Sequence, residues 1–185
     1  MPVIHSHCSY CGTAYAPDLA WPRVCAHCGE TTWLNPLPVA LVMMPILEED
    51  GRTGLLMVRR GIEPQLGLLG LPGGFIEEGE SWQEGAVREL REETGLVADA
   101  SEVTLADVLS APHHVILIFG AVKPRPRAEV DAITPDAVRR LSNDETQELA
   151  VIRDFAARAH QGAYEEIRKL REGGGAAKGH KATKE

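Results

Sequence analysis

The stretch Leu71–Leu96, LPGGFIEEGESWQEGAVRELREETGL, is the most informative part of this chain. It predicts where a loop ends and a helix begins. It holds seven glutamates, five glycines and two arginines. Ser81 with Glu84 three residues later is typical of a helix N-cap, and Gly95 is typical of a helix C-cap. The stretch therefore predicts a glycine-rich loop that leads into a helix at about 81–94.

Three glutamates of this expected helix fall on one face. At 3.6 residues per turn, Glu89, Glu92 and Glu93 lie within an arc of roughly 100°. Val87 and Leu90 form an adjoining apolar face, so the carboxylates lie beside the core. Like charges four residues apart, such as Glu89 and Glu93, destabilise a bare helix. A solvated face with salt bridges accounts for some of these charges but not for three acids on one face. Carboxylates are the ligands that Mg²⁺ and Mn²⁺ prefer, together with phosphate oxygens of a substrate.

The same stretch resembles the Nudix box, G-x5-E-x7-R-E-U-x-E-E-x-G-U, in which U is aliphatic. The matching residues are Gly74, Glu80, Arg88, Glu89, Leu90, Glu92, Glu93, Gly95 and Leu96. This resemblance to the Nudix hydrolases implies an α/β fold, the Nudix αβα sandwich with a mixed sheet, for residues 36–160. It also implies metal-dependent hydrolysis of the pyrophosphate bond in a nucleoside diphosphate linked to another moiety, such as ADP-ribose, NADH or FAD.

The resemblance further implies roles for individual box residues. The expected ligands of the catalytic Mg²⁺ or Mn²⁺ are Glu89, Glu92 and Glu93, assisted by the carbonyl of Gly73. Glu80 would pair with Arg88 and hold the loop and helix in shape, which is a structural role. Gly73 and Gly74 would let the backbone approach the substrate closely.

The general base differs among Nudix enzymes, and two locations stay open here. It is either a glutamate of the box or one on a later loop. The later candidates are Glu145 and Glu148, in the segment NDETQE (143–148). A polar loop or a helix cap is the competing interpretation of these two residues.

All four cysteines lie near the N-terminus, in two Cys-x-x-Cys pairs that are each followed by glycine. The residues are Cys8, Cys11, Cys25 and Cys28. Four sulfurs around one centre suit a structural Zn²⁺ and leave no position for a catalytic water. Disulfides are disfavoured by the missing secretion signal, and one redox-active pair does not explain the duplication. Residues 1–35 are therefore expected to form a zinc ribbon whose folding energy comes from the ion.

The rest of the chain predicts strands followed by helix. Runs rich in Val, Ile and Leu indicate strands at residues 39–47, 53–60, 73–77, 103–110 and 115–122. After Pro135 apolar residues return at helical spacing, namely Ile152, Phe155, Ala156, Ala159, Ala163, Ile167 and Leu170. Residues 161–185 are expected to hold the end of this helix and a disordered basic tail.

A zinc ribbon ahead of a Nudix domain resembles the NADH pyrophosphatase branch of the family. That branch carries a Ser-Gln-Pro array after the box, whereas this chain has LSAPHHVILIFG (109–120). Ser110 and Pro112 are kept but the glutamine is missing, so the element associated with NADH preference is broken. His113 and His114 stand in its place and are candidates for substrate contact, with plain loop histidines as the alternative.

Charge and hydropathy limit the partners. The net charge of −8 is concentrated before residue 168, which argues against duplex nucleic acid as a partner unless cations intervene. The apolar runs are too short to cross a membrane, and with no secretion signal the expected compartment is the cytoplasm. A non-catalytic sensor of nucleotide sugars that uses the ribbon to bind a partner is the alternative function. A homodimer is compatible with either.

Overall fold

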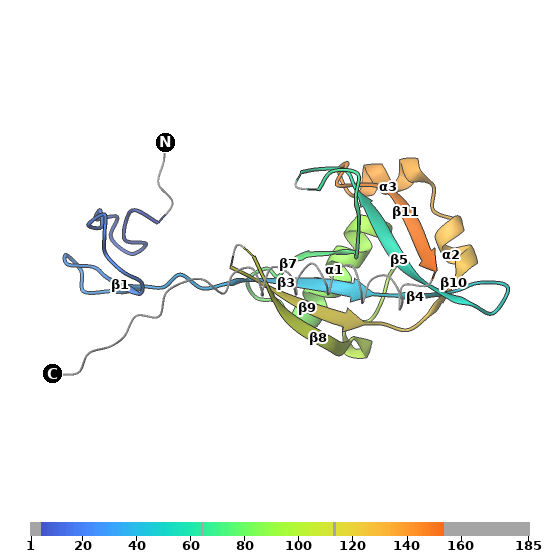
Figure 1. The fold of residues 1–185 in the computed structure, drawn as a ribbon, viewed down its shortest axis with the longest axis horizontal. Helices are drawn as coiled ribbons and strands as arrows, with labels where there is room; N and C mark the ends of the chain where they lie inside the picture. The colour runs from blue at the N-terminus through green and yellow to red at the C-terminus, as the bar shows by residue number, and fades with distance from the viewer. Residues whose placement is uncertain (1–4, 64, 113, 154–185) are drawn as a thin grey trace, which may run out of the picture. The chain divides into compact units, whose positions relative to one another are not determined.

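The computed structural model of the 185-residue chain describes residues 5–63, 65–112 and 114–153. The chain divides into two compact units, Met1–Leu37 and Pro38–Glu185. In the first unit, β1 (Arg23–Val24) pairs antiparallel with β2 (Thr31–Thr32). Most of residues 5–36 lies outside helices and strands, as the ribbon in Figure 1 shows.

The second unit contains two sheets. In the first, β4 (Pro45–Leu47) lies between β10 and β5, and β5 (Thr53–Arg60) also pairs with β11 (Thr146–Arg153) and β6 (Leu69–Gly70). The pairing of β10 (Arg125–Pro126) with β4 is parallel and the other pairings in this sheet are antiparallel, so the sheet is mixed. The second sheet has the order β7 (Gly73–Phe75), β3 (Leu37–Met43), β9 (Val115–Ala121), β8 (Thr104–Ala111).

Helix α1 (Trp82–Thr94) bridges the two sheets, since it contacts β7 and β9 of one and β11 of the other. Helix α3 (Pro135–Leu141) packs on β11, and α2 (Arg127–Asp131) lies next to β10, as Figure 1 shows. A short 3₁₀ turn, η1 (Ala100–Glu102), precedes β8. Within the described part of the chain, no helix is long and apolar enough to cross a bilayer.

The core forms where these elements meet. Ala40, Val42, Met44 and Ile46 alternate along β3 and β4 with no exposed surface, as the two-residue period of a strand requires. Leu90 of α1 packs into the same cluster. In strand β5 the residues 54–58 are all buried, because the strand has neighbours on both edges and is covered on both faces. This core fixes α1 against both sheets.

The expected mixed α/β fold is confirmed, with two corrections. The apolar run 39–47 is not one strand, since it divides at Met44 into β3 and β4, which lie in different sheets. Ile152 is not helical, because it lies in β11 opposite Leu55 of β5. The helix after Pro135 is α3, which ends at Leu141. The apolar residues predicted to continue a helix from Phe155 onward, and the tail 161–185, lie outside the described residues.

Candidate active site and metal centres

Helix α1 has the ends that its sequence predicts. The Ser81 hydroxyl accepts a hydrogen bond from the backbone N–H of Glu84, and the Glu84 carboxylate accepts one from the N–H of Ser81 (2.7 Å). Gly95 ends the helix in the left-handed conformation (φ 79°), and its N–H donates to the Arg91 carbonyl. Both caps fix where the helix begins and ends, so the helical period sets on which face each glutamate lies.

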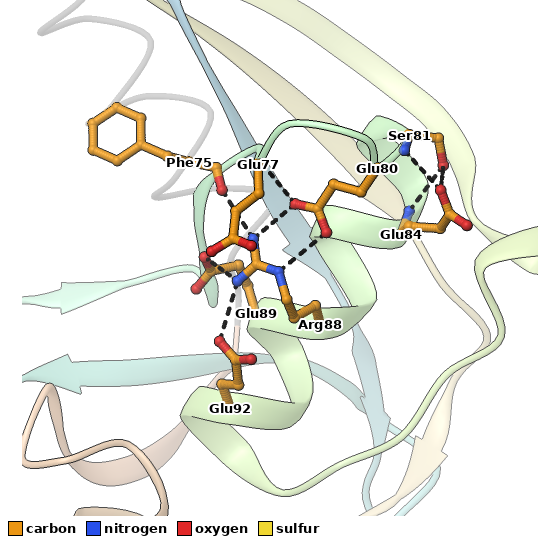
Figure 2. A network of polar contacts seen from close by, with 8 residues as sticks. All are labelled: Phe75, Glu77, Glu80, Ser81, Glu84, Arg88, Glu89 and Glu92. Atoms are coloured by element: carbon orange, nitrogen blue, oxygen red, sulfur yellow. Dashed lines mark hydrogen bonds and ion pairs between the residues drawn. The ribbon is translucent and has the colours of Figure 1, made fainter.

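Arg88 joins the loop to the helix, as Figure 2 shows. Its guanidinium donates to both carboxylate oxygens of Glu80 (3.1 and 2.8 Å) and to the Phe75 carbonyl (3.0 Å). It also pairs with Glu89 (2.8 Å) and Glu92 (3.1 Å). These hydrogen bonds hold the pKa of Glu80 below its usual range and raise the pKa of Arg88. The predicted Glu80–Arg88 pair is therefore present, as one part of a wider network.

The two glycines before the helix leave no room for side chains. A Cβ on Gly74 would lie 2.4 Å from Oε1 of Glu89. Gly73 has φ 151°, and a Cβ there would lie 2.1 Å from the Ala40 carbonyl oxygen. The backbone of β7 thus passes directly beside the Glu89 carboxylate. A side chain at 74 would displace that carboxylate, whereas at 73 the contact is with backbone and only glycine fits.

Glu93 occupies a position that helical spacing assigns to the core. It lies on the same side of α1 as the buried Ala86, Leu90 and Thr94, and only 7% of the residue is exposed. Its carboxylate accepts the backbone N–H of Gly73 (2.9 Å). Burial raises the pKa of Glu93 to about 7, with a smaller effect in the same direction from the charge of Glu89. The Gly73 N–H and the charge of Arg60 lower this pKa but do not offset the burial. A buried carboxylate is costly unless cations or hydrogen bonds compensate its charge.

Glu89 lies in a similar environment. Its pKa is raised chiefly by burial, against the stabilising effect of Arg88. The negative charges of Glu92 and Glu145 raise the pKa further. Glu92 differs from both neighbours, since its side chain is about half exposed at 48%. The three box glutamates therefore run from the core to the surface along one side of α1.

The structure separates the two later glutamates. Glu145 ends the turn after α3, close enough to Glu89 and Glu93 for its charge to raise the pKa of both. Glu148 lies in β11 rather than in a loop, opposite Arg59 of β5, and pairs with it (Nε to Oε1, 2.7 Å). Of the two candidates, Glu145 is the one that the fold brings to the box.

Within the described part of the chain, no interaction links the predicted substrate-contact residue His114 to the box glutamates. His114 is exposed at the tip of the β8–β9 hairpin, next to the paired residues Ala111 and Val115. Its φ of 59° is a turn conformation. His113 lies outside the described residues. A role for either histidine in substrate binding stays a prediction.

Two residues that contact the later glutamates are not predicted from the sequence. Arg59 pairs with Glu148, as described above, and Gly61 donates its N–H to the Glu145 carbonyl (2.7 Å). The only signal for Gly61 is its place directly after the apolar strand 53–60, which is not specific. Their roles depend on the pairing of β5 with β11, which residues far apart in the sequence determine.

The four cysteines converge on one point. Their sulfur atoms all lie within 4.8 Å of one another, with Cys8–Cys28 at 3.7 Å and Cys11–Cys25 at 3.6 Å. Four sulfurs placed tetrahedrally at about 2.3 Å from a zinc ion would be roughly 3.8 Å apart. All four are free thiols, so the disulfide alternative is not realised in this structure.

The two cysteine pairs are built in the same way. In each, the glycine after the second cysteine has positive φ, 73° at Gly12 and 79° at Gly29. Each glycine N–H donates to the carbonyl of the first cysteine, Cys8 or Cys25, at 2.9 Å. Two equivalent turns thus point two sulfurs each at the same centre, and this arrangement can hold a metal ion.

The carboxylates of α1 fit a hard divalent cation by the nature of their donors. Oxygen ligands, carboxylates above all, are what Mg²⁺ and Mn²⁺ prefer. In the described residues only the cysteines bring three or more ligand atoms within 4.8 Å of one another, because Glu89 and Glu92 are turned toward Arg88. The box therefore offers suitable ligands that must reorient to meet one ion.

Known proteins share the larger unit. The model of the NUDIX domain matches residues 36–170. An ADP-ribose pyrophosphatase of Methanocaldococcus jannaschii is 39% identical over 91 residues, which cover 46% of this chain and 50% of that protein. An NAD-capped RNA hydrolase NudC of Edwardsiella ictaluri is 27% identical over 116 residues, which cover 62% of this chain and 43% of that protein. The chain thus spans about half the length of these curated relatives.

The fold has a counterpart among solved structures. The crystal structure of a NUDIX hydrolase from Nitrosomonas europaea matches it with a TM-score of 0.56 at 19% sequence identity. The match covers 91% of this chain and 93% of that one. At this level of identity the likeness shows a common fold.

Proposed function

Because this chain belongs to the NUDIX domain family, we propose that it hydrolyses the pyrophosphate bond of a nucleoside diphosphate linked to a second moiety. One observation carries the proposal. The Arg88 network and the two glycines of β7 present Glu89 and Glu93 beside a closely approaching backbone, where burial raises the pKa of both carboxyls. Such an arrangement is costly for the fold and useful for holding cations.

The proposed roles follow from the position of each side chain. Glu89, Glu92 and Glu93 hold Mg²⁺ or Mn²⁺ together with the Gly73 carbonyl. When bound, the cation neutralises the pyrophosphate and lowers the pKa of a coordinated water. Glu145 is the candidate to accept a proton from the attacking water, because its charge acts on Glu89 and Glu93, whereas Glu148 is paired with Arg59. Glu80 and Arg88 keep the loop against the helix.

The relatives suggest where to look for the substrate. One is named an ADP-ribose pyrophosphatase and the other an NAD-capped RNA hydrolase. Both names describe a diphosphate that joins an adenosine to another group. We therefore expect this protein to act on a diphosphate of that kind, with ADP-ribose, NADH, FAD and an NAD-capped RNA as the compounds to compare.

We propose zinc for the cysteine cluster, as a structural ion. All four positions around the centre are sulfur, which selects Zn²⁺ over Mg²⁺ or Mn²⁺ and leaves no place for substrate. A cytoplasmic location fits thiols kept reduced. A homodimer remains a prediction from the sequence.

A substrate panel tests the proposed reaction. The full chain is incubated with each of the four compounds and with Mg²⁺ or Mn²⁺, and a phosphatase then releases phosphate from the monoesters formed. The intact diphosphate resists the phosphatase, so free phosphate reports cleavage. Glu92→Gln is expected to abolish the signal, whereas Glu78→Gln, the same charge change at an exposed loop position, keeps it. Tight binding of a nucleotide without any turnover would favour the sensor function instead.

A further inference from the structure

Gly61 lies against the turn that carries Glu145. It follows the last residue of β5, and its N–H donates to the Glu145 carbonyl at 2.7 Å. A Cβ on Gly61 would lie 1.8 Å from the Asp144 carbonyl oxygen and 3.3 Å from the carbonyl carbon of Glu145. The colliding atoms belong to the backbone, so no side-chain rotation relieves the contact. Any larger residue at 61 must displace the turn itself.

The turn has few ways to respond to such a push. Asn143 and Asp144 both have positive φ, 49° and 66°, a conformation that Asn and Asp tolerate better than most residues. The hydroxyl of the buried Ser142 accepts the N–H of Thr146 at 2.9 Å and closes the turn. The N–H of Glu145 donates to the Ser142 carbonyl at 3.0 Å. The backbone on both sides of Glu145 is therefore fixed by local hydrogen bonds.

Strand β11 begins directly after this turn, at Thr146. Thr146 is opposite Arg60, and a bulge then places Glu148 opposite Arg59. Glu148 pairs with Arg59, whereas Glu145 precedes the strand and its charge raises the pKa of Glu89 and Glu93. Gly61 thus contacts the backbone that carries Glu145, just before the chain enters β11.

We infer that Gly61 is a positioning residue for the hydrolysis, which acts by fixing the turn 142–146 and with it the reach of Glu145 toward Glu89 and Glu93. This inference rests on the proposed function, because it assigns Gly61 a role only through Glu145. It predicts that a side chain at position 61 lowers turnover by moving a carboxylate. It also predicts that substrate affinity is hardly changed.

The test compares two glycines, Gly54 near the start of β5 and Gly61 directly after its end. Gly61→Ala is expected to lower kcat about 10-fold to 100-fold with KM nearly unchanged, since a displacement of about 1 Å at a reacting group has effects of this size. Gly54→Ala is the matched control. A Cβ at Gly54 would crowd Val151 at 2.4 Å and the Ile152 carbonyl at 3.2 Å, at the opposite end of the same β5–β11 pairing. It should lower the melting temperature while leaving kcat close to that of the wild type.

A double-mutant cycle shows whether Gly61 acts through Glu145. Glu145→Gln alone should lower kcat by a factor of about 100 or more if the carboxylate takes the proton. If Gly61 acts only by placing that carboxylate, adding Gly61→Ala to Glu145→Gln should cause little further loss. Multiplicative effects of the two changes would overturn the inference, because they would show that Gly61 acts independently of Glu145.

Two further outcomes separate this inference from the proposed function. A wild-type chain without turnover on the whole panel overturns both. Turnover by the wild type that Glu145→Gln leaves unchanged overturns the inference alone. If Gly61→Ala does not fold, Ser142→Ala decides, because it loosens the same turn without a clash. Its loss of kcat must disappear in the Glu145→Gln background, and a loss that persists there contradicts the inference.

Discussion

The two units of this chain use metal-binding residues in opposite ways. In Met1–Leu37 the buried apolar residues are Cys8 and Cys25, so among the described residues its centre consists largely of the sulfur ligands. In Pro38–Glu185 the core is a cluster of aliphatic side chains, and the carboxylates of α1 lie at its edge. On the proposed assignments, the first unit is expected to need its ion in order to fold, whereas the second has an aliphatic core that folds without one.

The cysteine cluster and the carboxylates of α1 are therefore expected to affect stability in opposite directions. A thiolate cluster binds its ion only when the chain is folded, so the binding free energy becomes folding free energy. A buried carboxylate such as Glu93 works in the other direction, because it is desolvated whether or not a cation is present. Aliphatic burial elsewhere in the unit has to offset that cost.

The largest effect is expected from removing a zinc ligand. Cys8→Ser, or a strong chelator, should unfold residues 5–37 and leave the NUDIX domain folded. Zinc content by mass spectrometry and amide hydrogen exchange of the two units measure this directly. His27→Ala, an exposed residue inside the second cysteine pair, is the control and should retain the ion. Full zinc content in the Cys8→Ser protein would contradict a site of four thiolates.

Glu93→Gln should show the opposite combination of effects. Turnover is expected to fall by a factor of about 100 or more, since an uncharged amide is a poor ligand for Mg²⁺. The fold should persist, because the amide oxygen can still accept the Gly73 N–H. Steady-state kinetics and thermal unfolding of the same preparation give both quantities. Unfolding of this variant would show instead that Glu93 stabilises the domain.

The same variant should change how stability depends on pH. The pKa of Glu93 rises from its ordinary 4.5 to about 7 on folding, so the folded state binds more protons between these values. In metal-free protein the free energy of unfolding should therefore fall as pH rises from about 4.5 to about 7, by up to about 3 kcal/mol from this group. Denaturant titrations at several pH values should show a weaker fall in Glu93→Gln. An identical pH dependence would mean that Glu93 is ionised without cost.

Arg88→Met should have a smaller effect on stability. It keeps the aliphatic stem but removes the charge that Glu80 and Glu89 share, at a loss of about 2 kcal/mol for a partly buried network. Arg52→Met is the control, since its pair with Asp50 is exposed and should contribute nothing measurable. Equal midpoints in urea for the two variants would show that the Arg88 network is dispensable for the fold.

The smallest effect is expected at the start of α1. Ser81→Ala removes the N-cap hydroxyl and half of the capping box, which typically costs about 1 kcal/mol. Because the cap fixes only the helix end, kcat should stay within about twofold of the wild type when the loss of stability is this small. Chemical denaturation and the substrate assay check the two parts. A loss of turnover like that of Glu93→Gln would place the cap among the residues that set the site.

Local sequence patterns alone predict the ends of α1, the face of its glutamates and the two cysteine turns. The capping box of Ser81 and the terminator Gly95 specify α1 without help from the rest of the chain. The spacing of the box glutamates follows from the helical period. The two cysteine turns depend on a glycine one residue beyond each pair. In each case the deciding residues are separated by a few positions, so the pattern is visible before folding.

The positions of Glu145, Glu148 and Ile152 depend on tertiary structure, because they follow from the pairing of distant strands. Glu145 and Glu148 are equivalent candidates in the sequence. The pairing of β11 with β5 places Glu148 opposite Arg59, whereas Glu145 precedes the strand and its charge raises the pKa of Glu89 and Glu93. Ile152 fits a helical pattern until β5 supplies it with a strand partner. Register is set by hydrogen bonds between segments about 90 residues apart, and no local pattern encodes that choice.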